Sequence, residues 1–285
     1  VYKRQPKTPQ ELAAFLADHR DRAKILSGGT DIIPNMLSKL YKVDYLVDVS
    51  GVKELRGISY EAGKGLTIGA ATRMKDLERA AVVAEKYGAL HKAASEVGSP
   101  QIRAMATIGG NICNASPAAD TPPALAALGA VVSLLSSEGT RDMPLEEFVQ
   151  GNRITDLKPT EYLEKIFLPD VPPKSASRFG LTTLRAAVEI DIASLAVSIT
   201  VDDSGKVADC KIAMGAVAPV PLRASEAEQM LTGNTPDDAL IAKAGEKCAE
   251  ESKPIGDIRA SAEYRRHLIN VLAVRTIKDA LAAIG

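Results

Sequence analysis

Hydrophobic residues in the N-terminal part of the chain alternate between helical and strand-like spacing. Apolar positions three and four apart predict a helix over 8–19, and Thr8 followed by Glu11 is a capping box at its start. Short apolar runs at 23–26 and 44–50 predict buried strands, and a glycine turn that opens a helix lies between them. This order of helix, strand, helix and strand is typical of an α/β unit with parallel strands.

The middle of the chain continues to alternate between the two kinds of pattern. Strands are predicted over 65–72, 131–137 and 161–169, where apolar and β-branched residues dominate. Helices are predicted over 73–80 and, as one longer element, over 82–97. The result is a mixed unit of helices and strands without an internal repeat.

The pattern changes after the segment 169–177, which contains three prolines and is interpreted as a domain boundary. Residues 191–222 predict two long strands joined by a turn at an Asp-Ser-Gly sequence, an antiparallel hairpin. Helical patterns then cover 225–231, 236–252 and 261–284. The C-terminal third is therefore predicted to be a small α+β domain.

Composition excludes several functional classes. The net charge of −1 over 285 residues argues against a nucleic-acid partner, and no apolar run approaches the roughly 18 residues of a membrane helix. The start, VYKRQPKTPQ, lacks the apolar core of a signal peptide, so a cytoplasmic location is expected. Cys113, Cys210 and Cys248 are widely spaced and fit no metal motif, so we expect no metal on this chain. With 4% aromatic residues, an aromatic stacking platform is not expected.

Two segments with adjacent glycines are candidates for ligand binding: LSGGTDII at 26–33 and TIGGN at 107–111. Adjacent glycines allow positive φ and close approach of a ligand to the backbone. Successive N–H groups in such turns, next to a helix N-terminus, hold anions, so two loops could clamp the phosphates of a dinucleotide. Each loop by itself could instead be an ordinary turn or cap. Neither fits the GxGxxG or GxxxxGK[ST] motif.

Asp120, in the segment SPAADTPPAL, allows two interpretations. Its position before Thr121 and two prolines favours a helix cap, and the alternative is a hydrogen bond to a ribose hydroxyl. The three histidines lie outside both glycine segments, and no pairing of carboxylates or of Ser, His and Asp is present. No catalytic acid, base or nucleophile is therefore assigned to this chain.

The two segments in their full context, LSGGTDIIPNM and ATIGGNICNASPAADTPPALAALGA, resemble the FAD-binding subunit of molybdenum hydroxylases, the family of xanthine dehydrogenase and aerobic carbon monoxide dehydrogenase. The resemblance extends through GLTIGAATRMKDLE, EYLEKIFLP and RFGLTTLRAAVEIDIASLAV and covers nearly the whole chain. It implies an α+β fold. A two-part PCMH-type FAD-binding module like that of vanillyl-alcohol oxidase would span 1–173, with sub-parts at about 1–57 and 58–173. A C-terminal domain of the carbon monoxide dehydrogenase flavoprotein type would span 174–285.

The resemblance also implies the residues that hold a non-covalent FAD. The first glycine segment would wrap the pyrophosphate, the second would reach the phosphates and the flavin, and Asp120 would contact ribose, in place of the capping role. Ser116 would lie near the adenosine half, Ile166 near the flavin ring and Arg185 near the flavin edge. The full cofactor-binding set is Leu26, Ser27, Gly28, Gly29, Thr30, Asp31, Ile32, Ile33, Gly98, Thr107, Ile108, Gly109, Gly110, Asn111, Ser116, Asp120, Ile166 and Arg185.

The implied function is electron transfer within a complex. A large partner subunit would carry the molybdenum cofactor, and a small partner subunit would carry two-iron clusters that deliver electrons to FAD. The electrons would then pass to NAD, a quinone or oxygen, in a heterotrimer that pairs into a dimer of trimers. A self-contained FAD-dependent oxidase or reductase with the same cofactor fold is one alternative. A nucleotide-binding regulatory or assembly protein without a redox role is the other.

Overall fold

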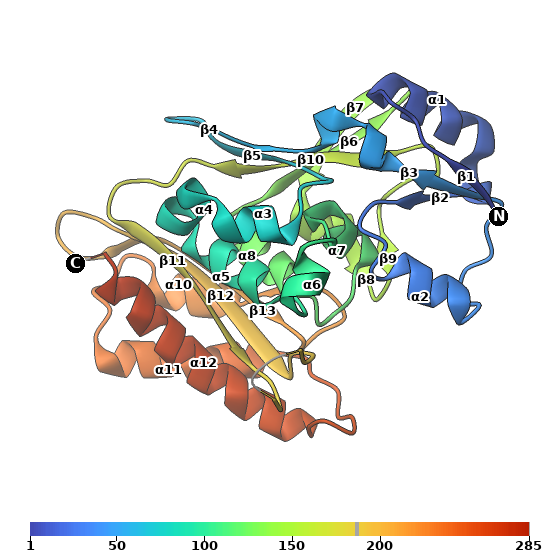
Figure 1. Cartoon of the computed structure of the whole chain (residues 1–285). Helices are drawn as coiled ribbons and strands as arrows, with labels where there is room; N and C mark the ends of the chain where they lie inside the picture. The colour runs from blue at the N-terminus through green and yellow to red at the C-terminus, as the bar shows by residue number, and fades with distance from the viewer. Residues whose placement is uncertain (186–187, 285) are drawn as a thin grey trace.

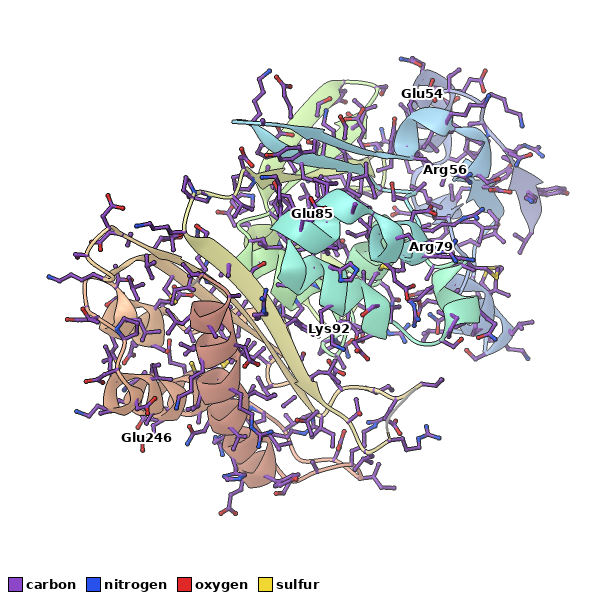
Figure 2. The ribbon with its side chains drawn as sticks, turned by 60° about the vertical axis from the view of Figure 1, so that its left-hand side comes forward. Glu54, Arg56, Arg79, Glu85, Lys92 and Glu246 are labelled. Atoms are coloured by element: carbon purple, nitrogen blue, oxygen red, sulfur yellow. The ribbon has the colours of Figure 1, made fainter. Side chains whose placement is uncertain are left out.

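The computed structural model describes residues 1–185 and 188–284, and the chain folds into packed layers of helices and strands. Figure 1 shows a small sheet near the N-terminus, a group of helices between two larger sheets, and a helical layer near the C-terminus. Charged side chains such as those of Glu54, Lys92 and Glu246 point outward from these layers (Figure 2). Among the described residues, no helix combines the length and apolar character that a bilayer crossing demands.

The N-terminal unit contains three parallel strands in the order β1-β3-β2. The parallel pairing of the strands at 23–26 and 45–48 was predicted, whereas the strand at 2–4 was not. The Thr8 hydroxyl accepts a hydrogen bond from the Glu11 amide at 3.2 Å, and Leu12 and Leu16 are buried below this capped helix. The carboxyl end of the strand over 23–26 leads directly into the first glycine segment. The elements are β1 (Tyr2–Arg4), α1 (Pro9–His19), β2 (Ala23–Leu26), α2 (Ile32–Leu37) and β3 (Tyr45–Asp48).

The middle of the chain forms an antiparallel sheet of order β4-β5-β10-β6-β7, with a group of helices packed below it in Figure 1. These helices and the sheet share one buried apolar cluster. The elements are β4 (Ile58–Glu61), β5 (Gly65–Gly69), α3 (Met74–Arg79), α4 (Ala81–Lys86), α5 (Gly88–Glu96), α6 (Pro100–Arg103), α7 (Ile108–Asn114), α8 (Thr121–Ala127), β6 (Val131–Ser136), β7 (Gly139–Pro144), α9 (Leu145–Phe148), β8 (Val149–Gly151), β9 (Ile154–Thr155) and β10 (Tyr162–Pro169).

The helix predicted as one element over 82–97 is in fact two helices, α4 and α5, because the backbone leaves the helical region at Tyr87. The break turns the Tyr87 ring into the core, where its hydroxyl donates to the Pro169 carbonyl at 3.1 Å. Gly88 follows, and a Cβ there would lie 2.9 Å from the Ser177 carbonyl oxygen. Periodicity could not show this break, since it arises from contacts with residues about 80 positions away.

The C-terminal part contains an antiparallel sheet of order β11-β12-β13-β14. The predicted hairpin is present as β12 and β13, whereas the first strand, directly after the proline-rich segment, was not predicted. In Figure 1, α5 and α8 lie against one face of this sheet, and α10 and α12 cover the other. The elements are β11 (Ser175–Thr182), β12 (Ala193–Val201), β13 (Val207–Gly215), β14 (Leu222–Arg223), α10 (Ser225–Leu231), α11 (Asp238–Glu251) and α12 (Ala262–Ala282).

Candidate functional site

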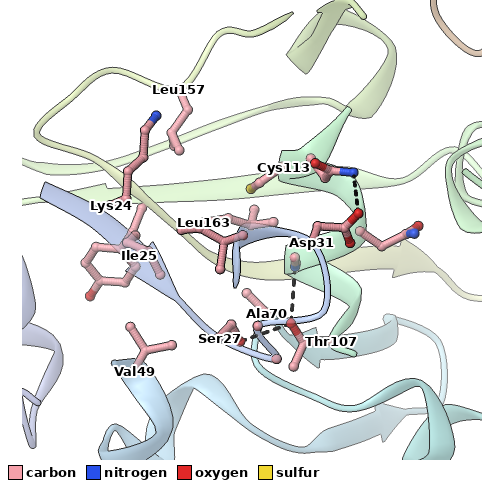
Figure 3. A pocket seen from close by; sticks show the side chains of 18 of the residues that line it. Lys24, Ile25, Ser27, Asp31, Val49, Ala70, Thr107, Cys113, Leu157 and Leu163 are labelled. Atoms are coloured by element: carbon pink, nitrogen blue, oxygen red, sulfur yellow. Dashed lines mark hydrogen bonds between the residues drawn. The ribbon is translucent and has the colours of Figure 1, made fainter. Parts of the chain in front are cut away.

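A cavity of about 650 Å³ lies beside β2, between the N-terminal sheet and the helices of the middle unit. Its wall contains most of the first glycine segment, the start of α7, residue 98 with Ile102 of α6, and residues between 153 and 163. Figure 3 shows side chains such as those of Asp31, Cys113 and Leu163 converging on it. Cofactor pockets in proteins have volumes of roughly 300–1,000 Å³, so the cavity has the size of a cofactor site.

The first glycine segment lines the cavity and contains backbone N–H groups that make no hydrogen bond within the described residues. Among the described residues, no acceptor takes a hydrogen bond from the amides of residues 28–32, and the first amide of this region with a partner is that of Ile33. Gly29 has φ +78°, a conformation that glycine adopts without strain and that turns successive amides to one side. Since α2 has only six residues, these amides rather than a long helix dipole provide the attraction for an anion.

Close contact between the two glycine segments holds the first one in place. A Cβ at Gly28 would lie 2.3 Å from the Met105 carbonyl oxygen, so only glycine fits between these backbones. The Thr107 hydroxyl donates to the Ser27 hydroxyl at 3.0 Å. The Asn114 amide donates to the Asp31 carboxylate at 3.2 Å, which turns this negative charge toward α7 (Figure 3).

The second glycine segment differs from the prediction, because it forms the first turn of α7 and neither glycine has positive φ. Its amides already donate within the protein: Ile108 to the Thr72 carbonyl, Gly109 to the Ala70 carbonyl and Gly110 to the Thr107 hydroxyl. Glycine is required at 109 for packing instead, since a Cβ there would lie 2.6 Å from the Ala70 oxygen. This segment therefore supplies a wall of the cavity, and its amides at 108–111 are not free for phosphate.

The predicted cofactor-binding residues fall into two groups. Those that line the cavity are Ser27, Gly28, Gly29, Thr30, Asp31, Ile32, Gly98, Thr107, Gly109, Gly110 and Asn111. The other seven lie outside its lining: Leu26, Ile33, Ile108, Ser116, Asp120, Ile166 and Arg185.

Several residues of the second group have other surroundings. Ile166 is fully buried at the centre of β10, where it pairs with Ile68 and Val132. Ile33 is 40% exposed on α2, and Arg185 is exposed, with its guanidinium 2.6 Å from the Glu189 carboxylate. In this structure none of these three side chains faces the cavity.

Asp120 lies at the start of α8 but does not cap it, because its backbone is helical and its side chain makes no capping hydrogen bond. Burial raises the pKa of its carboxyl well above the usual range. Burial and the nearby Asp120 charge together raise the pKa of Asp191, which is 3% exposed and whose Oδ2 atom lacks a partner in the described structure. The two carboxyls thus form an acidic pair where α8 meets the C-terminal sheet, with Asp191 buried and Asp120 partly buried.

Three cavity residues that the sequence analysis did not single out are Lys24, Tyr41 and Arg153. The Lys24 ammonium lies 5.6 Å from the centre of the Tyr41 ring, and the Arg153 guanidinium lies 3.4 Å from the Tyr41 hydroxyl. The sequence could have indicated Lys24, because it is a charged residue inside the short strand that leads into the first glycine segment. Tyr41 and Arg153 belong to loops that are far apart in sequence and meet only in the fold.

Other reactive groups in the described residues are few. Cys113 lines the cavity, and burial raises the pKa of its thiol to about 12, so it stays protonated near neutral pH. No group of three or more His, Cys, Asp or Glu side chains within residues 1–185 and 188–284 is arranged to hold a metal ion. The cavity is therefore suited to binding and positioning a ligand through amides and cations.

Known proteins match this chain over most of its length. Residues 3–171 match a family model described as the FAD binding domain in molybdopterin dehydrogenase. Residues 182–280 match one described as the CO dehydrogenase flavoprotein C-terminal domain. The glyceraldehyde dehydrogenase medium chain of Sulfolobus acidocaldarius is 32% identical over 95% of this chain and 94% of its own. The carbon monoxide dehydrogenase medium chain of Afipia carboxidovorans is 32% identical over 98% and 96%.

Solved structures give the same result. A carbon monoxide dehydrogenase from Hydrogenophaga pseudoflava superposes with a TM-score of 0.93 at 28% identity, covering 98% of this chain and 96% of its own. Quinoline 2-oxidoreductase from Pseudomonas putida 86 superposes with a TM-score of 0.91 at 29% identity, covering 99% and 97%. The free amides and the size of the cavity fit the diphosphate of the dinucleotide that such a domain binds. The chain belongs to the family of FAD-binding medium subunits of molybdenum hydroxylases, and it is an oxidoreductase component.

Proposed function

We propose that this chain is the electron-transfer subunit of a molybdenum hydroxylase complex. It would hold FAD between the iron–sulfur clusters of a small partner subunit and an acceptor that is NAD, a quinone or oxygen. A large partner subunit would carry the molybdenum cofactor, and the three chains would form a heterotrimer that pairs into a dimer of trimers. When bound, FAD supplies the capacity to exchange electrons both singly and in pairs.

The row of free amides at residues 28–32 is the observation that carries this proposal. Five consecutive residues that line one cavity carry N–H groups without a partner among the described residues, and such a run suits the oxygen-rich diphosphate of FAD. Ser27, Thr107 and Asn114 fix these amides in position before the ligand arrives. Binding therefore requires little reorganisation of the protein.

The remaining site assignments are proposals on weaker grounds. Gly98, Asn111 and the start of α7 are proposed to shape the wall around the cofactor, as their place in the lining supports. Asp120 is proposed to accept a hydrogen bond from a ribose hydroxyl, and Ser116 to lie near the adenosine half. Ile166 and Arg185 would act near the flavin only in an arrangement different from the present one. Residues 1–173 and 174–285 are proposed as the two domains.

The cofactor is proposed to be non-covalent and the protein to work in the cytoplasm. The Cys113 thiol lines the cavity and is kept protonated by burial, which supports a non-covalent FAD. The three cysteines are free, which suits a reducing compartment. Heat or acid should release the flavin from the polypeptide as FAD, and flavin that stays with the denatured chain would contradict this assignment.

Co-expression with the genes of a large and a small partner would test the electron-transfer role. We expect the three chains to elute together in gel filtration. Addition of the organic substrate should bleach the flavin absorbance of the intact complex. A complex assembled with a flavin-free variant should still reduce its iron–sulfur clusters, while transfer to NAD, quinone or oxygen should be lost.

Two results would contradict the proposal. A flavin-free complex that reduces the acceptor as fast as the intact one would show that electrons leave by another route. A chain that stays alone in gel filtration and oxidises an organic substrate by itself would favour the self-contained oxidase. The isolated chain is expected not to oxidise an organic substrate, because insertion of a water-derived oxygen needs a metal centre.

A further inference from the structure

The cavity contains one aromatic ring that a ligand can reach. Of the lining residues, the aromatic ones are Tyr41 and Tyr162. Tyr162 is 1% exposed, and its hydroxyl donates to the Pro9 carbonyl at 3.3 Å, so its ring belongs to the core. Tyr41 lies in the loop between α2 and β3 and is partly exposed. A planar group that enters this end of the cavity therefore meets the ring of Tyr41.

Two cations flank this ring. The Lys24 ammonium lies 5.6 Å from the ring centre, and the Arg153 guanidinium lies 3.4 Å from the ring hydroxyl. The backbone of Arg153 is held by a hydrogen bond from its amide to the Ala115 carbonyl at 2.9 Å. Lys158, a neighbouring cation, pairs with Glu161 at 4.0 Å, whereas Lys24 and Arg153 form no salt bridge with any residue that the structure describes.

The lysine beside the ring and the free amides lie at two ends of one strand. Lys24 is near the start of β2, and the amides at 28–32 follow its carboxyl end. Four residues of extended chain span about 13 Å, at 3.3 Å per residue. This is the length scale of a nucleoside attached to a phosphate. A diphosphate on the amides thus brings one of its attached ring systems to Tyr41.

We propose that Tyr41, with Lys24 and Arg153 beside it, is the stacking site for one ring system of the bound dinucleotide. The ring would lie against the tyrosine face, and the two cations would face its nitrogen and oxygen acceptors or the adjoining phosphate. Both halves of FAD offer a planar nitrogen heterocycle joined to a phosphate, so the chemistry is shared by adenine and isoalloxazine. This assignment rests on the proposed placement of FAD at the free amides.

Titration of the flavin-free full chain with three ligands tests the proposal. FAD carries both ring systems, ADP carries adenine with a diphosphate, and FMN carries isoalloxazine with a phosphate. Tyr41→Leu should weaken FAD binding about 5- to 150-fold, the range that loss of stacking on an aromatic side chain gives. Tyr41→Phe keeps the ring and should retain most of the affinity. Tyr264→Leu is the matched control, because Tyr264 is 50% exposed on α12 and outside the cavity.

The two partial ligands then identify which half occupies the site. A parallel loss for ADP but not FMN assigns Tyr41 to adenine, and the reverse pattern assigns it to isoalloxazine. Unchanged FAD affinity in Tyr41→Leu, or an equal loss in Tyr41→Phe, would overturn the stacking proposal. Lys24→Met provides a second variant in which the ring is intact, and it should weaken the same partial ligand. Failure of the wild-type chain to bind FAD at all would instead refute the proposed cofactor site.

Discussion

Replacing Gly28 by alanine tests how strongly the first glycine segment depends on its contact with residues 105–107. The new methyl group would lie 2.3 Å from the Met105 carbonyl oxygen and 2.9 Å from the Ala106 Cα atom. Both are backbone atoms, which cannot rotate aside, so the two segments must separate. Gly28 does not have positive φ, so backbone strain adds nothing and the effect is purely steric. Separation would also stretch the hydrogen bond between Ser27 and Thr107.

The size of the effect follows from these contacts. Overpacking of this kind costs about 1–3 kcal/mol, and a neutral hydrogen bond contributes about 0.5–1.5 kcal/mol. If the free chain relieves the overlap by opening the loop, FAD must close it again. The affinity should then fall about 5- to 150-fold for the 1–3 kcal/mol of overlap. Isothermal titration of the flavin-free protein measures this loss, and thermal unfolding without ligand shows how much appears as instability.

Gly256→Ala is the control for this experiment. The nearest atom to a Cβ at Gly256 is 3.6 Å away, an ordinary contact, and the residue lies outside the cavity. It should leave both FAD affinity and unfolding temperature close to those of the wild type. If Gly28→Ala behaves in the same way, the loop does not need its contact with residues 105–107, and the preorganisation argument is wrong.

Three further predictions follow from the site. Gly109→Ala should lower the unfolding temperature more than Gly110→Ala. A Cβ at 109 would lie 2.6 Å from the Ala70 backbone oxygen, whereas a Cβ at 110 would lie 3.0 Å from the Thr107 hydroxyl, which belongs to a side chain. Equal melting curves would contradict this prediction. Asp120→Ala should weaken FAD binding by about 0.5–1.5 kcal/mol, the contribution of an ordinary hydrogen bond, and unchanged affinity in a titration would indicate that Asp120 has only a structural role. The unfolded chain releases the Asp191 proton above about pH 4, whereas the folded chain keeps this proton until the pH reaches the raised pKa. The free energy of unfolding should therefore fall as pH rises through the raised pKa. Asp191→Asn should flatten this fall in unfolding measured from pH 5 to 9, and an unchanged slope would exclude Asp191 as its source.

Local patterns predicted those parts of the fold that local interactions decide. Thr8 and Glu11 start α1 because a cap acts within one turn, and β2 with β3 follows from apolar runs around a glycine turn. The strand over 175–182 was hidden by the preceding prolines. Its pairing with β12 depends on residues about 20 positions later. Sequence patterns of a few residues carry no information about such pairing.

The sequence predicted that the two glycine segments belong to the candidate site, but it did not predict how the backbone of each segment is arranged. Both glycine pairs were expected to expose amides, yet only the first does, since α7 uses its own amides internally. The low aromatic content argued against a stacking ring, but a single tyrosine placed by a loop is enough to line the cavity. Neither Tyr41 nor Arg153 belongs to a sequence motif. Their contact depends on how the loop at 38–44 lies against the turn at 153.

The two glycine segments therefore have different physical tasks, although they look alike in sequence. At Gly29 the absence of a side chain permits positive φ, which exposes donors to the ligand. At Gly109 it permits contact with Ala70, the residue directly after strand β5, and this contact positions α7. Substitutions in the first segment should mainly change cofactor affinity, and those in the second should change folding and affinity together. Because Gly28 lies where the segments touch, its contact transmits the position of α7 to the amides that hold the diphosphate.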